Sequence, residues 1–183
     1  DYDRTLTIPA AILAQARRTP EAVAVIAGNT SLSYADLAAR AGKIANTLQS
    51  MGVRQGSLVG LVCRRTPDMV AGALGIQLAG AAYVLMDPAY PADRLALYAE
   101  DSGCPVIVTE SGVADTLPQG PARLVLDTDP RLASAPATAP PRSPRITTTP
   151  TVTVPTAIPS VATTARSFAH ASTPSAPPSR PST

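Results

Sequence analysis

The first 33 residues carry a helical period followed by two short apolar runs. Apolar residues recur at about every fourth position around Pro9–Arg18, which predicts one helix. The runs Ala22–Ala27 and Ser31–Tyr34 flank Gly28 and Asn29, a pair that tolerates positive φ angles. These two runs therefore predict a β-hairpin that leads directly into a second helix.

The second predicted helix has clear start and stop signals. Ser33 and Asp36 stand three residues apart, as in a capping box, and the charge of Asp36 is favoured at the positive end of the helix dipole. Gly52 is placed to end the helix in a left-handed conformation. One face of this helix is apolar, formed by Leu37, Ala41, Ile44, Ala45, Leu48 and Met51.

From residue 57 onwards, helices and short apolar strands alternate. The helix that starts at Pro67 is apolar nearly all round, with Gly72 and Gly75 at a spacing that permits close packing, so it should be buried against a sheet. The alternation predicts an α/β fold: a partial doubly wound, mostly parallel sheet preceded by the β-hairpin. The last two strands are apolar enough to be covered on both faces. The predicted elements are strand Ser57–Cys63, helix Pro67–Leu78, strand Ala81–Leu85, helix Pro91–Ser102 ended by Gly103, strand Val106–Thr109 and strand Leu124–Leu126.

The composition changes after residue 130. Residues 131–183 consist almost entirely of Ala, Pro, Ser, Thr and Arg and contain no Gly, Asp, Glu or Lys. Such a sequence cannot bury enough apolar surface to offset its ordering entropy, so we expect a disordered tail at 131–183 after a folded part at 1–130. Three origins compete: a natural linker, an O-glycosylated stalk that would need a secretory route, and a change of reading frame in GC-rich DNA, which we favour.

Charge and hydropathy exclude two classes of partner. Residues 1–130 hold 10 basic and 13 acidic side chains, a formal charge of −3, and the tail adds five Arg. The basic pI of 8.8 is therefore a property of the tail, with no basic face and no interleaved aromatics for nucleic acid. No apolar stretch is long enough for a membrane span, and no signal pattern opens the chain. We expect a cytoplasmic protein without nucleic-acid or membrane partners.

Two other features bear on the class of the protein. Cys63 and Cys104 are forty residues apart with no nearby His, which favours two buried, unpaired thiols over a disulfide or a metal site. The chain begins at Asp1 rather than Met, which suggests a segment of a longer protein, although processing would give the same start.

The most informative segment is LAGAAYVLMDPAYPADRLALYAEDSGCPVIVT, from Leu78 to Thr109. It resembles the second conserved core segment of non-ribosomal peptide synthetase adenylation domains, which belong to the AMP-binding, adenylate-forming superfamily. It departs from the usual pattern at Leu78, where the family has Lys, and at Leu85, where the family has Pro. The segment LSYADLAARAGKIANTLQSMGV resembles the first core segment, with Asp36 in place of the customary Glu. The residues that match the second segment are Ala79, Gly80, Ala82, Tyr83, Val84, Asp87, Pro88, Tyr90, Pro91, Arg94 and Leu95.

The resemblance covers roughly Leu6–Asp129 and implies the N-terminal portion of an adenylation domain, truncated or frame-shifted after about residue 139. The complete family activates an amino acid with ATP and Mg²⁺ as an aminoacyl-adenylate and then loads it on a carrier-protein phosphopantetheine thiol. Its phosphate loop, acidic and Arg motifs and C-terminal Lys all lie downstream of this point. The implied partners are the remainder of the adenylation domain and the carrier and condensation domains of the parent synthetase. The fragment itself is expected to be inactive.

The residues that invite a catalytic interpretation have simpler ones. Gly72, Gly75 and Gly80 fit no phosphate-binding glycine motif. Lys43, the only Lys, lies on the polar face of its helix, where a solvated role is expected. Asp87 ends a strand, where α/β sheets place their sites, but an Asp before Pro commonly fixes a turn by accepting backbone amides.

The remaining candidates are aromatic, acidic or isolated. We expect Tyr83 to fill the core and Tyr90 the loop, rather than to stack on a ligand. The acids on the predicted helix around Arg94 indicate a solvated face with local ion pairs: Asp93, Glu100 and Asp101. His170 stands alone in the tail. We therefore assign no catalytic, cofactor-binding or metal-binding residue and no cofactor to this chain.

A second hypothesis remains open from the sequence. The chain could be a non-catalytic α/β binding or interaction module with a disordered tail, and whether it is an enzyme stays uncertain. The coding sequence just past Ala139 separates the two hypotheses, because only a synthetase gene would encode the missing phosphate loop there.

Overall fold

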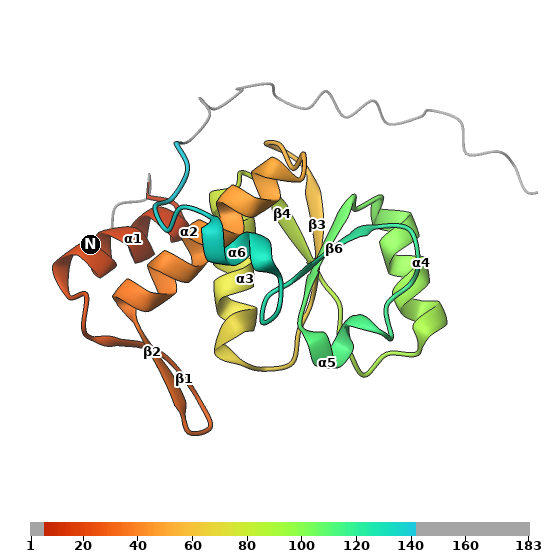
Figure 1. Ribbon diagram of the computed structural model, residues 1–183, viewed down its shortest axis with the longest axis horizontal. Coiled ribbons are helices and arrows are strands. Elements are labelled where there is room, and N and C mark those ends of the chain that lie inside the picture. The colour runs from red at the N-terminus through yellow and green to blue at the C-terminus, as the bar shows by residue number, and fades with distance from the viewer. Residues whose placement is uncertain (1–5, 142–183) are drawn as a thin grey trace, which may run out of the picture. The chain divides into compact units, whose positions relative to one another are not determined.

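The computed structural model describes residues 6–141. Within this range the chain forms six helices and six strands, arranged in Figure 1 as a hairpin and a helix at one end and a layered α/β unit beside them. The elements are α1 Ile8–Arg18, β1 Val23–Ala27, β2 Thr30–Ser33, α2 Tyr34–Ser50, β3 Leu58–Val62, α3 Pro67–Leu78, β4 Ala82–Leu85, α4 Ala92–Ser102, β5 Val106–Thr109, α5 Ser111–Ala114, β6 Ala122–Val125 and α6 Pro130–Ser134.

The predicted hairpin and the helix boundaries are confirmed. Strands β1 and β2 pair antiparallel around Gly28, which has φ +58°. The Ser33 hydroxyl accepts the Asp36 amide at 3.1 Å and donates to the Asp36 carboxylate at 2.7 Å, which completes the capping box of α2. Gly52 follows the end of α2 with φ +93°, and Gly103 ends α4 with φ +59°.

Four parallel strands form the sheet, in the order β4-β3-β5-β6. The chain runs from β3 outwards to β4 and then crosses back to the other side of β3 to form β5. The parallel sheet predicted from the alternating pattern is confirmed. The strand order places β3 and β5 at the centre, and all four residues of β5 are buried.

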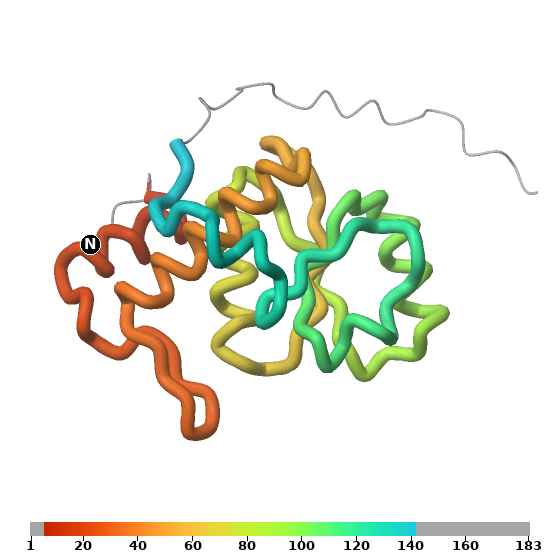
Figure 2. The backbone as a smooth tube through the Cα atoms, in the orientation of Figure 1, coloured from red at the N-terminus to blue at the C-terminus, as the bar shows by residue number. Residues whose placement is uncertain are grey.

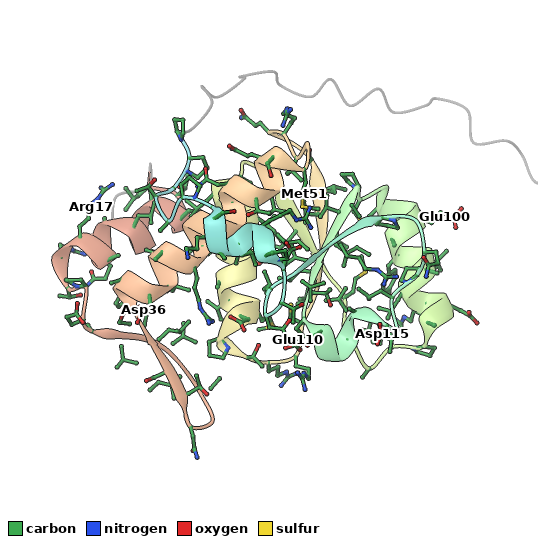
Figure 3. All side chains as sticks on the ribbon, viewed as in Figure 1. Arg17, Asp36, Met51, Glu100, Glu110 and Asp115 are labelled. Carbon is green, nitrogen blue, oxygen red and sulfur yellow. The ribbon has the colours of Figure 1, made fainter. Side chains whose placement is uncertain are left out.

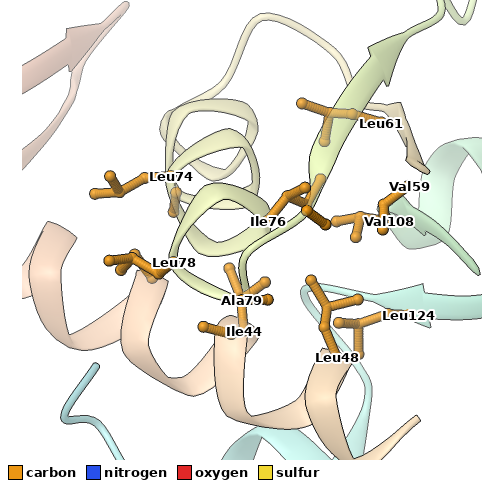
Figure 4. Close-up of a cluster of buried hydrophobic side chains, with 14 of the residues drawn as sticks. Ile44, Leu48, Val59, Leu61, Leu74, Ile76, Leu78, Ala79, Val108 and Leu124 are labelled. Carbon is orange, nitrogen blue, oxygen red and sulfur yellow. The ribbon is translucent and has the colours of Figure 1, made fainter. Parts of the chain in front are cut away.

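Helices cover both faces of the sheet. On one face α2 and α3 pack over β3, β5 and β6 in a core of aliphatic side chains, shown in Figure 4 around Ile76, Val108 and Leu124. On the other face α4 and the segment around α5 cover a second core that contains Val62, Met86, Leu95 and Ile107. This two-sided burial explains why the central strands are continuous apolar runs.

Two glycines on α3 permit its close contacts, as their spacing predicted. A Cβ atom built on Gly75 would lie 2.6 Å from Ile44 Cγ2 of α2 and 3.1 Å from the Ala41 carbonyl oxygen. A Cβ atom on Gly72 would lie 3.0 Å from Leu61 Cδ1 of β3. The first glycine therefore sets the approach of the two helices, and the second sets the approach of α3 to the sheet.

Residues 131–141, which the sequence assigned to the tail, continue the structure along α2. Helix α6 begins at Pro130, and the chain then passes over α2, as the path in Figure 2 shows. Asn46 on α2 donates to the carbonyl oxygens of Pro136 at 3.0 Å and Thr138 at 2.8 Å. A side chain at Gly42 would collide with Ala137, because its Cβ atom would lie 1.9 Å from that carbonyl oxygen. The rest of the expected tail lies outside the described residues.

Two expectations about burial are wrong. Strand β6 runs from Ala122 to Val125 rather than Leu124 to Leu126, and only Leu124 is buried, because β6 is an edge strand and not an interior one. Tyr83 lies on β4 at the opposite edge and is 42% exposed, so it does not fill the core. The one-turn helices α5 and α6 were not predicted, since a single turn gives no periodic pattern.

We predict that Gly75→Ala destabilises the protein although Ala is the better helix former. The added methyl group overlaps the branch point of Ile44, so the helices must separate, at a net cost of about 1–3 kcal/mol. Urea unfolding followed by circular dichroism measures the change. Gly72→Ala is the matched control with a smaller expected cost, because its overlap is with the far end of a flexible leucine. Equal effects of the two variants would contradict this account.

Candidate functional site

The carboxyl ends of the parallel strands are where an open α/β sheet places a ligand, above all beside the point where the strand order reverses. In this chain that point lies between β3 and β5. The segments that follow the four strands meet there: residues 63–66 after β3, 86–90 after β4, 110–112 after β5 and 126–129 after β6. The candidate site is built from these segments.

An ion pair joins the ends of the two central strands. Glu110 follows β5, and one of its carboxylate oxygens accepts both the Arg64 amide and the Arg64 Nε–H, each at 2.7 Å. The Glu110 side chain is only 6% exposed, while that of Arg64, which follows β3, is 63% exposed. Figure 3 marks Glu110 at the start of α5. The pair therefore fixes a buried carboxylate with a largely solvated guanidinium.

Local features hold this ion pair in place. The Thr109 hydroxyl donates to the Val62 carbonyl oxygen at 2.9 Å, which ties the last residue of β5 to the last residue of β3. Gly112 leaves room for the guanidinium, since a Cβ atom at this position would lie 3.2 Å from Arg64 Nη2. Strand pairing and a small residue together position the two charges.

Glu110 is ionised at neutral pH in this setting. Burial of the carboxyl group by itself raises its pKa, but the hydrogen bonds from the Arg64 side chain and amide and the guanidinium charge outweigh it, so the net pKa lies below its usual range. A carboxylate committed to two donors on one oxygen is a poor general base. The geometry therefore favours a structural function for Glu110.

A second acid ties β6 to the same place. Asp127 accepts the Ser111 amide at 2.9 Å on one oxygen and the Ser111 hydroxyl on the other. The hydroxyl contact is the main reason that the pKa of Asp127 is lowered. These bonds link the segment after β6 to the start of α5, next to Glu110.

The thiol beside this cluster is not a nucleophile. Burial, and then the negative charges of Glu110, Asp68 and Asp127, raise the pKa of Cys63 to about 12. Only the thiolate attacks, so at neutral pH Cys63 stays protonated and inert. Cys63 and Cys104 are both buried and free, which confirms the expectation of two unpaired thiols.

Asp87 fixes a turn, as its position before Pro88 predicted. Its carboxylate accepts the Ala89 amide at 2.9 Å, and its carbonyl oxygen accepts the Tyr90 amide at 3.0 Å. The adjacent loop is held by a stacked arginine rather than by the ion pairs expected on α4. The guanidinium of Arg94 lies 4.2 Å from the ring centroid of the half-buried Tyr90, and its Nη2 donates to the Tyr98 hydroxyl at 2.9 Å.

A cavity of about 400 Å³ lies between α2, the start of α3 and the segment after β6. Its wall carries charges of both signs, and most of them are already paired. Arg40 contacts Asp68, and Asp129 accepts Arg131 at 2.6 Å. Lys43 is half-buried in this wall rather than fully solvated as the helix pattern suggested. The cavity resembles a closed network of ion pairs more than a site prepared for one ligand.

The described residues do not fit ATP or Mg²⁺. Gly72 and Gly75 face Leu61 and Ile44, so their open space is already filled and cannot cradle a phosphate. Lys43, the only Lys in the chain, faces a cavity that also carries three aspartates. Residues 6–141 contain no group of three or more His, Cys, Asp or Glu side chains that could hold a metal ion. In the same range no helix is long and apolar enough to cross a membrane.

The sequence of the chain matches that of a known enzyme family. Residues 12–179 match the AMP-binding enzyme family. The chain belongs to this family. It is 40% identical over 141 residues to a protein of the linear gramicidin synthase from Brevibacillus parabrevis, a match that covers 76% of this chain but only 2% of that protein.

Solved structures of the family share this fold. The crystal structure of the non-ribosomal peptide synthetase FmoA3 matches with a TM-score of 0.69 and 39% identity, over 73% of this chain and 14% of that one. The N-terminal subdomain of Klebsiella oxytoca NpsA matches with a TM-score of 0.64 over 75% of this chain and 35% of the subdomain. At 20% identity the second match concerns the fold alone. The resemblance to peptide synthetases read from the motifs is confirmed, and the chain is a small part of such proteins.

The residues that organise this edge of the sheet were not singled out from the sequence. Arg64, Glu110 and Asp127 each stand within two residues of the end of an apolar strand, which was a usable signal. Their pairing was not visible, because Arg64 and Glu110 are 46 residues apart and only the strand order brings them together. No catalytic or ligand-binding set emerges among the described residues.

We predict that Glu110→Gln lowers stability at neutral pH by about 1–2 kcal/mol, because it removes a charge-assisted bond to a partly solvated Arg64. The folded pKa of Glu110 is lowered, so its contribution is present above the unfolded value of about 4.3 and is lost as pH falls through the folded pKa. The gap in unfolding free energy between wild type and variant should therefore shrink below about pH 4.

Urea unfolding at several pH values between 7 and 3 measures this gap. Glu100→Gln is the matched control: the same substitution at an exposed position of α4, marked in Figure 3, should leave the stability unchanged at neutral pH. A gap between wild type and Glu110→Gln that stays constant across the pH range would show that the charge of Glu110 does not stabilise the fold.

Proposed function

We propose that this chain is the N-terminal part of a peptide synthetase adenylation domain and that it supplies scaffold rather than catalytic groups. The complete domain would join an amino acid to ATP as an aminoacyl-adenylate, with Mg²⁺, and transfer it to a phosphopantetheine thiol. The division at residue 130, with the family-like part before it and a tail of different origin after it, belongs to this proposal.

The observation that carries the proposal is the joint match in sequence and fold to FmoA3, at 39% identity and a TM-score of 0.69. It covers the segment whose motifs pointed to the amino-acid-activating branch. The turn at Asp87 and the stacked Arg94 give those motif residues a structural explanation, since both act within the loop after β4.

The proposed partners follow from the missing parts. ATP, Mg²⁺ and the amino acid would be bound by residues that this chain does not contain, so the remainder of the adenylation domain is required. Carrier and condensation domains of the parent synthetase would receive and use the activated amino acid, in the cytoplasm, where ATP and amino acids are supplied.

We predict that the purified chain catalyses no amino-acid-dependent exchange of pyrophosphate into ATP. The reason is that its carboxyl edge holds only mutually paired charges and no phosphate cradle. The assay is run with each proteinogenic amino acid, and a complete adenylation domain from a relative is the positive control. Exchange above the blank without amino acid would contradict the scaffold proposal.

A second prediction concerns the gene rather than the protein. If the tail arises from a change of frame, one of the other frames past the codon for Ala139 should encode a T-S-G-x-T-G-x-P-K-G loop. Sequencing the parent DNA and translating the three forward frames settles this. Absence of the loop from every frame would remove the frame-change origin and favour a non-catalytic module.

A further inference from the structure

Strand β4 presents a free edge to its surroundings. It pairs with β3 on one side, where the Ala82 amide donates to the Ser57 carbonyl oxygen and the Met86 amide donates to that of Leu61, each at 3.0 Å. Because amides alternate in direction along a strand, those of Tyr83 and Leu85 point away from β3. Among residues 6–141 no strand pairs with this outer edge.

The side chains along this edge are apolar and uncovered. Tyr83 is 42% exposed and Leu85 is 59% exposed. Their partners in the register are Val59 and Leu61 of β3, which are almost fully buried on the face covered by α3. The apolar face of the sheet therefore continues past the helix that covers it and is left open over β4.

This edge lacks the features that protect free edges in complete proteins. The segment Ala81–Met86 contains no charged residue and no Pro. The opposite edge strand, β6, carries Arg123, whose guanidinium donates to the carbonyl oxygens of Leu117 at 3.0 Å and Pro118 at 3.2 Å. The two edges are thus unlike, and only the β4 edge combines free amides with exposed apolar side chains.

We infer that the β4 edge, defined by Tyr83 and Leu85, is the surface on which the remainder of the adenylation domain docks. The occupant is an extended, apolar segment of that remainder, which completes the hydrogen bonds of β4 and covers both side chains. This rests on the proposed function. The matched fold supports it, because this chain covers only 35% of an N-terminal subdomain that contains the same sheet, so most of that subdomain is missing here.

The test is complementation in trans. The full 183-residue chain, carrying an affinity tag, is co-expressed with the remainder of the adenylation domain of the gramicidin synthase relative, starting at the position that aligns with residue 142. Association is measured by co-purification and by the dissociation constant. The relative's own N-terminal part is the positive control for the remainder.

Two substitutions of equal chemistry locate the surface. Leu85→Glu should weaken association at least tenfold, because it places a charge in a covered apolar contact. Leu97→Glu on α4 is the matched control, since Leu97 is 60% exposed, nearly the same as Leu85, and should have no effect. Hydrogen exchange on the complex should show new protection of the Tyr83 and Leu85 amides.

Three results would overturn the inference. The first is equal effects of the two substitutions or unprotected Tyr83 and Leu85 amides in a complex that forms, which would leave the proposed function standing. The second is no association of this chain with a remainder that the relative's own N-terminal part does bind. The third is self-association of the chain alone, seen by sedimentation and abolished by Leu85→Glu, which would make a second copy the occupant. The reading-frame result tests the proposed function independently of all three.

Discussion

The parallel pairing of β3 with β5 is the contact on which the rest of the structure depends. These strands are separated in the sequence by α3, β4 and α4, yet they form the centre of the sheet. Each is covered on one face by α2 and α3 and on the other by α4. Their pairing brings the start of α3 next to the start of α5 and so creates the carboxyl edge where the charged residues meet.

That edge shows how scaffold and chemistry are separated in this chain. A site for ATP needs donors and cations that are free to meet developing charge. Here the charges are consumed internally: Glu110 by Arg64, Asp127 by Ser111 and Asp129 by Arg131. The reversal point of the sheet is therefore closed by its own ion pairs, and a ligand would have to displace bonds that hold strands together. A scaffold that leaves catalysis to other segments accounts for this arrangement.

The sequence predicted elements far better than neighbours. Periodicity and caps located α2, α3 and α4, because these signals are local: Ser33 and Asp36 are three residues apart, and Gly103 ends its helix by its own φ angle. Whether a strand lies at the centre or the edge depends on strand order, which no local pattern carries. For this reason the exposure of Tyr83 and the partial exposure of β6 were missed, as was the pairing of Arg64 with Glu110. Candidate chemistry failed for the same reason as topology.

The segment after β6 explains why a change in composition did not mark the end of the structure. Residues 136–138 are held on α2 through their carbonyl oxygens, which accept the Asn46 amide group, and by the space left at Gly42. Every residue has a carbonyl oxygen, so a stretch of Ala, Pro and Thr satisfies this contact as well as any other. The specificity resides in Asn46 and Gly42, ninety residues earlier. Composition reports whether a segment can form a core of its own, and it says nothing about whether another element will bind its backbone.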